Sequence, residues 1–517
     1  MSGLPLLTIL TLTPLLGGLP LLFGGKLDAT YARRTAMVFC GISILQVFNL
    51  WCNFDPAAAR MQFIEEHGWI PSLQVHYMLG IDGLGLLMVL LSAIVVPMAL
   101  LLSGRIQERV PLFNGLVLLL QSGLFGTFTA LNFIHWFIFW ELSLIPAYFL
   151  IKLWGGPQRV AAATQFFLYT LVGSVAMLIG FQAIYLATDS FDFQLLAKMG
   201  ASAELAAKLG QLHLGGITGH SLVMLVFAAV LLAFAVKVPM FPFHTWLPNA
   251  YAEAPSSVTM LLTGAMSKMG VYGLLRIVLP LFPAQMREWQ TPLLWLAVGT
   301  IVLSACAAFA QKDLKRILAY SSINHLGYCL LGIFAVAGVT GTEARWSLER
   351  AAALNGVLLQ MFNHGITAAA LFGFVAMIEQ RSGGLRGLDD FGGLRKAAPV
   401  FTGLMGIAVF ASIGLPGLSG FVGEFLIFKG AFALVPWAAA LSALGLLVTA
   451  VFLLTMVQRV FHGPLNERWR GFADLSLNER LIVAPALVVM FLLGLWPQAV
   501  IGWINATTGG VVAFLGQ

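Results

Sequence analysis

Uncharged apolar runs of about 20 residues recur along the whole chain, and they restrict its possible folds more than any other feature. A helix needs about 20 apolar residues to cross a membrane. The runs are continuous rather than alternating, which excludes a membrane β-barrel. Only 10% of the 517 residues are charged, against about 25% in a typical globular domain, so charged side chains cannot cover a water-facing surface of this size. The sequence therefore predicts an all-α polytopic membrane protein.

The runs predict about 14 transmembrane helices, two of them broken by proline or glycine. The predicted spans are 4–23, 35–52, 82–102, 112–131, 133–151, 163–187, 220–247 (broken), 257–279, 292–310, 316–337, 353–378, 399–429 (broken), 437–458 and 481–505. Two long loops lie between early spans. We expect loop 53–81 to fold onto the membrane surface, and loop 188–219 to contain a short amphipathic helix.

The distribution of basic residues predicts the orientation of the chain in its membrane. Of the 28 lysines and arginines, 18 fall in odd-numbered loops and 8 in even-numbered loops and their flanks, while Lys237 and Lys268 lie inside spans. Loops rich in lysine and arginine stay in the cytoplasm. We therefore expect odd-numbered loops in the cytoplasm and both termini on the non-cytoplasmic side.

Cofactor and nucleic-acid signatures are missing from the sequence. The four cysteines show no CxxC spacing, so we expect no iron–sulfur, zinc or disulfide site. Neither a Walker motif nor a dinucleotide-binding glycine fingerprint occurs. The net charge of +6 comes from loop residues. We expect no metal, nucleotide or flavin in this chain and no nucleic-acid partner.

An internal repeat is visible in the order of the spans. Spans four to eight and spans nine to thirteen form two groups of five, each with a broken fourth member. Lys237 and Glu424 mark these broken members and lie 187 residues apart, while Glu141 and His325 mark the second members and lie 184 apart. An odd number of spans makes the second copy inverted, as in transporters. The predicted divisions are an N-terminal three-helix segment (1–102), the first inverted repeat (112–279), the second (292–458) and a C-terminal helix (481–517).

Six of the ionisable residues inside predicted spans form a series of acids, amines and imidazoles. An ionisable group at the centre of a membrane costs about 2.5–3.5 kcal/mol on insertion scales, and such groups mark ion pathways. Acids, amines and imidazoles in series are the groups that a proton relay needs. The candidate relay residues are Glu141, Lys237, Lys268, His325, His364 and Glu424.

The helix breaks lie beside two of these residues. Proline lacks a backbone N–H and clashes with the preceding turn, which frees carbonyl groups that water or polar side chains must satisfy. The predicted break residues are Pro239, Pro242, Gly414, Pro416 and Gly417. We therefore expect water beside Lys237 and Glu424. His244 is a possible accessory group at the first break.

Purely structural interpretations remain open for each candidate. Glu141 and Lys237 could form a buried structural ion pair, and Lys268 could extend to an interface. The two histidines of the relay could be an interfacial residue and a hydrogen-bonded bundle residue. His244, with Trp246, could simply anchor a half-helix.

At these residues the chain resembles a known family. The segments that carry the likeness are WELSLIPAYFLIKLWGG, KVPMFPFHTWLPNAYAEAPSSVTMLL, SKMGVYGLLR, QKDLKRILAYSSINHLGY, MFNHGITAAALF and GLPGLSGFVGEF. They are similar to the M-type antiporter-like proton-pumping subunits (chain 4) of NADH–quinone oxidoreductase, respiratory complex I. The likeness runs from about residue 70 to 480, and it favours the M type because Glu424 stands where related subunits usually have lysine.

The resemblance carries implications for the site. It implies that Glu141 and Lys237 pair in an input half-channel, that Lys268 is the central lysine, that His325 and His364 link across, and that Glu424 is the output group. The family usually reads WLPDAH where Asn249 and Tyr251 stand here. That difference removes an acid and an imidazole, which we expect near the cytoplasmic edge.

The resemblance also implies partners and a location. Flavin, iron–sulfur clusters and quinone would be bound by partner subunits, and the neighbours would be other antiporter-like subunits in a bacterial inner or thylakoid-type membrane. Two alternatives stay open at this point. One is a subunit of a multisubunit cation/proton antiporter or membrane-bound hydrogenase, and the other is a structural membrane subunit without a relay.

Overall fold

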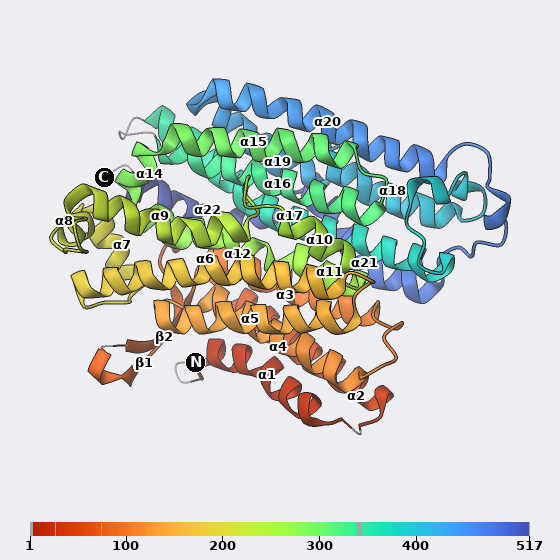
Figure 1. The fold of residues 1–517 in the computed structure, drawn as a ribbon, viewed down its shortest axis with the longest axis horizontal. Coiled ribbons are helices and arrows are strands. Elements are labelled where there is room, and N and C mark those ends of the chain that lie inside the picture. The colour runs from red at the N-terminus through yellow and green to blue at the C-terminus, as the bar shows by residue number, and fades with distance from the viewer. Residues whose placement is uncertain (1–3, 26, 74, 339–343, 516–517) are drawn as a thin grey trace.

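The structure, a computed structural model, describes residues 4–25, 27–73, 75–338 and 344–515. It is a bundle whose helices run roughly along the long axis of the molecule (Figure 1). The first part of the chain contains α1 (Leu6–Phe23), α2 (Ala29–Asn53) and α3 (Gly83–Leu101). The predicted surface loop 53–81 contains an antiparallel hairpin of β1 (Gln62–Ile70) and β2 (Val75–Ile81).

The next group of helices matches the predicted first repeat. It consists of α4 (Val110–Thr129), α5 (Phe133–Trp154), α6 (Arg159–Thr188), α9 (Gly219–Lys237), α10 (Trp246–Glu253) and a span from Ser256 to Leu281. That span is built from α11 (Ser256–Leu261), α12 (Lys268–Gly273), α13 (Leu279–Leu281) and two π-helical stretches, Leu262–Met266 and Leu274–Val278. The predicted helix in loop 188–219 is confirmed as two short helices, α7 (Phe193–Ala201) and α8 (Glu204–Gly210).

The remaining helices form the second group and the C-terminal part. They are α14 (Pro283–Glu288), α15 (Gln290–Phe309), α16 (Leu314–Ala337), α17 (Ala344–Ser382), α18 (Pro399–Ile413), α19 (Ser419–Leu434), α20 (Pro436–Phe461), α21 (Leu477–Leu495) and α22 (Gln498–Leu515). Short 3-10 turns lie at Pro71–Leu73, Leu388–Asp390, Leu394–Lys396 and Glu467–Trp469.

Fourteen helices in the described part of the chain are long and apolar enough to cross a membrane. The predicted number is thus matched, but two assignments differ. The halves of the second broken span, α18 and α19, are individually too short to be counted. The predicted last span, 481–505, is wrong as a single helix, because α21 ends at Leu495 and α22 starts at Gln498. Pro497 explains the break, since a residue that precedes proline is disfavoured in a helix.

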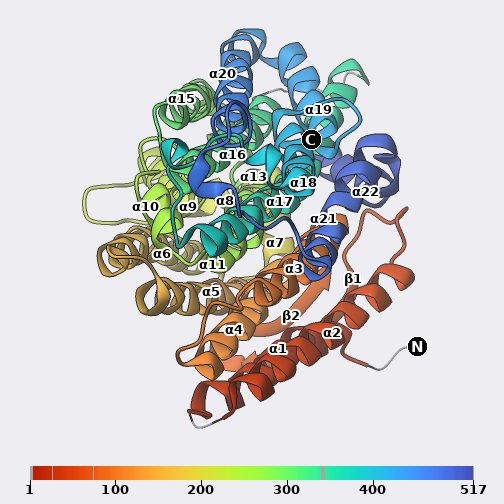
Figure 2. The ribbon, with the colours of Figure 1, turned by 90° about the vertical axis from the view of Figure 1, so that its right-hand side faces the viewer.

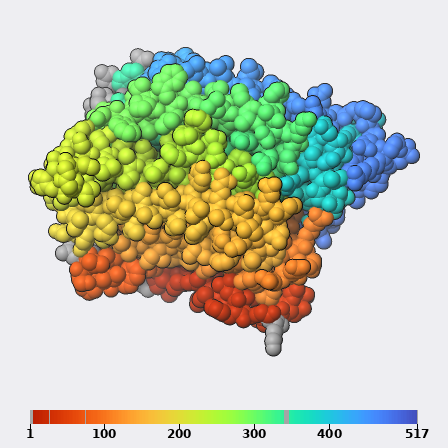
Figure 3. Space-filling view, viewed as in Figure 1, coloured from red at the N-terminus to blue at the C-terminus, as the bar shows by residue number. Residues whose placement is uncertain are grey.

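The segments lie in space largely in the order of the chain, except that α21 and α22 pack on α3. Successive parts of the sequence form bands across the molecule (Figure 3). Seen from the end, α1 and α2 lie at one edge and α15 and α20 toward the opposite edge (Figure 2). The most buried spans are Ser256–Leu281 and α17, whose most apolar windows are fully covered, whereas the window of α2 is only 28% buried. Side chains on the central spans are therefore shielded from lipid by other helices of the same chain.

Candidate functional site

The first broken span ends its first half at Lys237. Residues 238–245 are not helical, and they contain both predicted break residues, Pro239 and Pro242. The carbonyl groups freed by the break are satisfied within the protein. The Trp246 indole N–H donates to the Val236 carbonyl at 3.0 Å, and the Met240 N–H donates to Ala235 at 2.8 Å. Backbone and indole groups, rather than the expected water, therefore satisfy these two carbonyls.

Lys237 is buried against an aromatic ring. Only 2% of the residue is exposed, and its ammonium lies 4.8 Å from the ring centroid of Trp140. Such cation–π contacts stabilise a cation by about 0.5–2 kcal/mol. The Trp140 indole N–H in turn donates to Ser174 Oγ at 2.9 Å. The ammonium is thus held by a ring whose own orientation is fixed by a hydrogen bond.

Glu141 is the neighbour of Trp140 on α5 and interacts electrostatically with Lys237. The two side chains do not form an ion pair within 4 Å among the described residues. Glu141 Oε1 is buried without a hydrogen-bond partner. The structure therefore brings the two residues of the expected pair near one another but not into contact.

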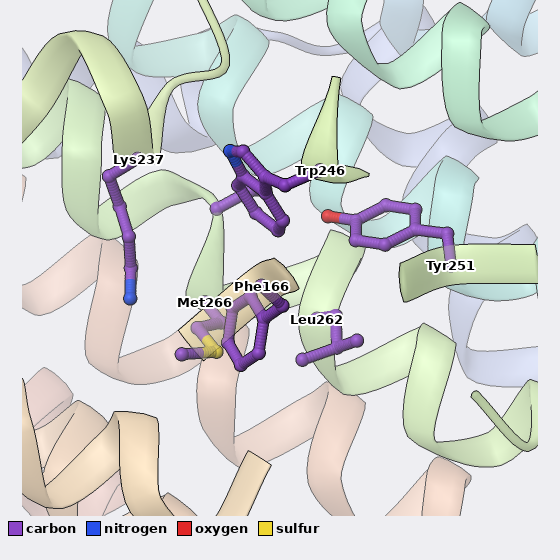
Figure 4. Close-up of a pocket in the computed structure, with 7 residues that line it drawn as sticks. Phe166, Lys237, Trp246, Tyr251, Leu262 and Met266 are labelled. Carbon is purple, nitrogen blue, oxygen red and sulfur yellow. The ribbon is translucent and has the colours of Figure 1, made fainter. Parts of the chain in front are cut away.

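A small cavity borders Lys237 (Figure 4). It offers about 10 Å³ to the centre of a water molecule, roughly the space that one water needs. Its lining residues are Phe166, Lys237, Trp246, Tyr251, Leu262, Met266 and Ser267. In Figure 4 the indole of Trp246 stands between the Lys237 side chain and Tyr251, whose hydroxyl points toward the middle of the group.

Lys268 lies where α12 begins, directly after a π-helical stretch and Ser267. π-Helical turns inside α-helices are frequent at functional sites. The Lys268 residue is fully buried. Its ammonium donates to the Thr263 carbonyl and lies 3.3 Å from Ser267 Oγ and 2.9 Å from His364 Nδ1. The lysine is therefore in direct contact with the next residue of the predicted relay.

Two histidines continue from Lys268 toward the second broken span. The rings of His364 on α17 and His325 on α16 stack with centroids 5.0 Å apart and planes inclined by 16°. His325 Nε2 lies 3.5 Å from Glu424 Oε1 on α19. The Gln360 side-chain amide donates to the same oxygen at 3.4 Å. Lys268, His364, His325 and Glu424 thus form one contiguous buried row.

The second broken span supplies a hydrogen-bond acceptor to this row. α18 ends with Gly414 in a left-handed conformation (φ 81°), and Gly417 is also left-handed (φ 92°), which glycine adopts without steric cost. His325 Nε2 lies 2.8 Å from the freed Ser412 carbonyl, and Nδ1 lies 2.7 Å from the Ser321 carbonyl. A neutral imidazole donates from one nitrogen only, so both carbonyls are satisfied together only by the protonated ring.

Other predicted residues stay outside the row. His244 stacks on Phe241 with centroids 5.5 Å apart, and its Nδ1 is buried without a hydrogen-bond partner. Asn249 is partly buried and hydrogen-bonded on both sides: its amide N–H donates to Gln165 at 2.9 Å, and its amide oxygen accepts from Arg316 at 3.2 Å. Within the described part of the chain, no group of three histidine, cysteine, aspartate or glutamate side chains is arranged to hold a metal.

Sequence reasoning missed two kinds of functional candidate. Tyr251 was considered only as a departure from the family pattern, but it is 1% exposed and lines the Lys237 cavity. Lys315 was expected in a loop, but it is 1% exposed and donates to the Ala254 carbonyl between α10 and α11. Lys315 directly precedes the predicted span 316–337 and is the second residue of the observed α16, so a basic residue at the boundary of a span was the available signal.

Comparisons with known proteins agree with this architecture. A family model described as NADH:quinone oxidoreductase/Mrp antiporter, TM, matches residues 130–452. The NADH-quinone oxidoreductase subunit M of Rhodobacter capsulatus is 34% identical over 98% of this chain and 96% of its own length. The F(420)H(2) dehydrogenase subunit M of Methanosarcina mazei is 34% identical over 99% of this chain and 98% of its own.

Solved structures give the same result. A chain of respiratory complex I from Thermus thermophilus superimposes with a TM-score of 0.84 at 30% identity, covering 99% of this chain and all of that chain. A chain of the Mrp complex from Dietzia reaches a TM-score of 0.81 at 20% identity, covering 100% of this chain and 98% of that chain. The second likeness shows the shared fold.

Proposed function

Because this chain belongs to the NADH:quinone oxidoreductase/Mrp antiporter transmembrane family, we propose that it is a proton-translocating, non-redox membrane subunit of a quinone-reducing complex. The observation that carries the proposal is the contiguous row Lys268–His364–His325–Glu424, buried between helices of both halves of the chain. Every member of the row exchanges protons, and a purely structural subunit would have no use for the cost of burying them.

The oxidoreductase assignment is favoured over an antiporter assignment. The relatives from Rhodobacter capsulatus, Synechococcus elongatus and Methanosarcina mazei, each above 30% identity, are named as oxidoreductase or dehydrogenase subunits, whereas the Mrp likeness is at 20% identity and concerns the fold alone. In this proposal, flavin, iron–sulfur clusters and quinone are bound by partner subunits, and neighbouring antiporter-like subunits flank this chain in a bacterial inner or thylakoid-type membrane.

The two groups of five spans act as inverted repeats in this proposal. The same neighbours pack in both groups: the first member on the second (α4 on α5, α15 on α16), and the third on the broken fourth (α6 on α9, α17 on α19). The groups are 112–279 and 292–458, flanked by 1–102 and 481–517. With odd-numbered loops in the cytoplasm, both termini lie on the non-cytoplasmic side.

Proton movement starts at the first break and ends at the second. A charge change passed from a neighbouring subunit alters the electrostatic interaction between Glu141 and Lys237. When the carboxylate no longer stabilises the ammonium, Lys237 releases a proton toward Lys268. About 1.4 kcal/mol changes a protonation equilibrium tenfold, so a small displacement of the acid suffices. The proton then passes through His364 and His325 to Glu424 and leaves on the outer side.

The test measures proton translocation and electron transfer by the complete complex in vesicles. We expect Lys268→Ala to abolish translocation, Glu141→Ala to lower it, and Asn249→Asp to change it little. Lys429→Ala is the matched lysine control, because Lys429 is exposed and pairs with Glu349 at 3.0 Å on the surface. Normal translocation by an assembled Lys268→Ala complex would refute the relay.

A further inference from the structure

Four small hydroxyl side chains lie along one face of the span that carries Lys268. Their spacing of three, four and four residues places them above one another on a helix. All four are buried, with exposed fractions of 6% or less. They are Ser256, Thr259, Thr263 and Ser267, and we refer to them as the hydroxyl stripe.

The stripe ends at Ser256 near the protein surface, and we call this its outer end. It touches a cluster of ionisable side chains at a loop end of the bundle. The Ser256 hydroxyl donates to Glu379 Oε2 at 2.6 Å. Arg386 lies 3.7 Å from Glu379 and 2.6 Å from Asp313. The Arg386, Asp313 and Glu379 side chains are 17–26% exposed, so the cluster reaches the surface where α10 passes into α11, in the right half of Figure 1.

A buried lysine joins this cluster to the stripe. Lys315 interacts electrostatically with Glu379, Arg386 and Asp313, and its ammonium donates to the Ala254 carbonyl. The Thr259 hydroxyl lies 3.5 Å from that same carbonyl. The relay through Lys237 gives no role to Lys315 or Glu379.

The inner end of the stripe reaches Lys268. Thr263 Oγ1 lies 3.0 Å from Ser322 Oγ, and the Thr263 carbonyl accepts from the Lys268 ammonium. Ser267 Oγ is 3.3 Å from the same ammonium. The stripe thus spans the distance from a surface cluster of carboxylates to the central lysine.

An independent observation is that this face adjoins a cavity the size of one water molecule. The buried hydroxyl of Tyr251 lies beside the hydroxyl groups of Thr263 and Ser267 but forms no hydrogen bond of good geometry. It lines the cavity together with Ser267. A water molecule in this cavity would complete the hydrogen bonding of Tyr251.

We infer that the hydroxyl stripe is a second proton-uptake path, which leads from the Glu379 cluster to Lys268 without passing through Lys237. The inference rests on the proposed function, because Lys268 must be a proton-carrying residue. Hydroxyl groups both donate and accept hydrogen bonds, and neighbours three to four residues apart on a helix leave about 5–6 Å between their Cβ atoms. Water molecules fill those gaps.

The transfer leaves every intermediate group unchanged. Glu379 takes a proton at the surface and passes it to Ser256, whose own hydroxyl proton moves to the next water. Each water and hydroxyl accepts one proton and releases one. The last proton reaches the unprotonated amine of Lys268, which becomes an ammonium, and Glu379 returns to its carboxylate form.

The experiment uses the complete complex in vesicles and compares matched variants. Thr263→Val keeps the shape of the side chain and removes the hydroxyl, and we expect proton translocation to fall roughly tenfold, less than the loss of about a hundredfold or more for a general acid–base group. Thr263→Ser keeps the hydroxyl and should restore translocation. Thr127→Val is the control, since Thr127 is equally buried but donates only to the Gly123 carbonyl of its own helix.

Two further variants keep the inference open to refutation if Thr263→Val fails to assemble. Ser256→Ala and Glu379→Gln alter the outer end of the stripe, and each should lower translocation several-fold. Normal translocation in Thr263→Val, or in both outer variants, while Lys268→Ala abolishes it, would overturn the second path and leave the relay intact. Normal translocation by Lys268→Ala would instead refute the proposed function itself.

Discussion

The two broken spans have similar backbone interruptions, but they treat the freed carbonyl groups differently. At the first break, the indole N–H of Trp246 donates a hydrogen bond to the Val236 carbonyl. An indole neither gains nor loses a proton at neutral pH. At the second break, the imidazole of His325 takes the Ser412 carbonyl. The second break is therefore hydrogen-bonded to a proton-carrying side chain, whereas the first holds its lysine against an aromatic ring.

In the proposed relay, this difference indicates which break takes part directly in proton transfer. Glu424 lies 3.5 Å from His325, so the second break is continuous with the buried row. Among the described residues, Lys237 forms no hydrogen bond or ion pair with the row, and a small cavity lined by Lys237, Trp246 and Ser267 lies beside it (Figure 4). Replacing His325 should therefore lower proton translocation more than replacing Trp246 does.

The largest effect is expected for His325→Phe. The substitution keeps an aromatic ring but removes both ring nitrogens. It thereby removes the imidazole that contacts His364 on one side and Glu424 on the other. We expect proton translocation to fall by about a hundredfold, within the range of a lost acid–base group. Trp246→Phe at the first break loses one hydrogen bond and should cost about 1 kcal/mol of stability, with a much smaller fall in translocation. Equal losses in both variants would contradict the comparison.

Gly414→Ala should have the next largest effect. Gly414 has a left-handed backbone (φ 81°), and an added Cβ would meet the carboxylate of Glu424. Strain of this kind costs about 1–3 kcal/mol, so we expect a lower melting temperature of the purified complex together with reduced translocation. Gly403→Ala is the control, because a Cβ there meets nothing within 4 Å. Unchanged melting of Gly414→Ala would show that the second break tolerates rearrangement.

A moderate effect is expected for Glu141→Gln. The glutamate acts on Lys237 only at a distance, without an ion pair within 4 Å, and such interactions weaken with separation. We expect translocation to fall roughly two- to tenfold, with electron transfer largely retained. Complete loss would indicate that the two residues come into contact during turnover.

The smallest effect is expected at acid pH, where the hydrogen bonds between Asp474 and the first turn of α18 should weaken. Partial burial raises the pKa of Asp474, but hydrogen bonds from the backbone N–H groups of Val400, Leu475 and Phe401 outweigh it and hold the pKa below its usual value. A lowered carboxyl pKa stabilises the folded state above the unfolded pKa of about 3.9, and the contribution is lost as the pH falls through the folded pKa. The protection of the Val400 and Phe401 amides, measured as exchange relative to the intrinsic rate at each pH, should therefore fall below about pH 4. In Asp474→Asn this pH dependence should be absent.

Much of the fold could be predicted because lipid requires long apolar helices. The continuous runs located most of the spans, and proline and glycine located both breaks. The split at Pro497 was missed, since the apolar run continues across it and hydropathy is insensitive to one interruption. The β1–β2 hairpin was also missed, because only pairing in three dimensions defines it.

The residues of the site could be predicted from the sequence, but the contacts between them could not. A charged residue within a span is visible in the sequence, which identified Lys268 and Glu424. The separation of Glu141 from Lys237 depends on side-chain direction, which spacing alone does not determine. Tyr251 and the hydroxyl stripe were missed, because tyrosine, serine and threonine are common in membrane helices and no charge distinguishes them.

The stacking of His325 on His364 has a consequence for the resting membrane. The rings face one another at 5.0 Å rather than sharing a proton edge to edge, and both nitrogens of His325 are occupied by carbonyl groups. A continuous hydrogen-bonded chain would let protons leak back down a potential that is worth about 2.3 kcal/mol per charge at 100 mV. In the proposed relay, the stack forms a gap that a proton crosses only when an imidazole turns, so the relay would insulate the membrane whenever nothing drives that rotation.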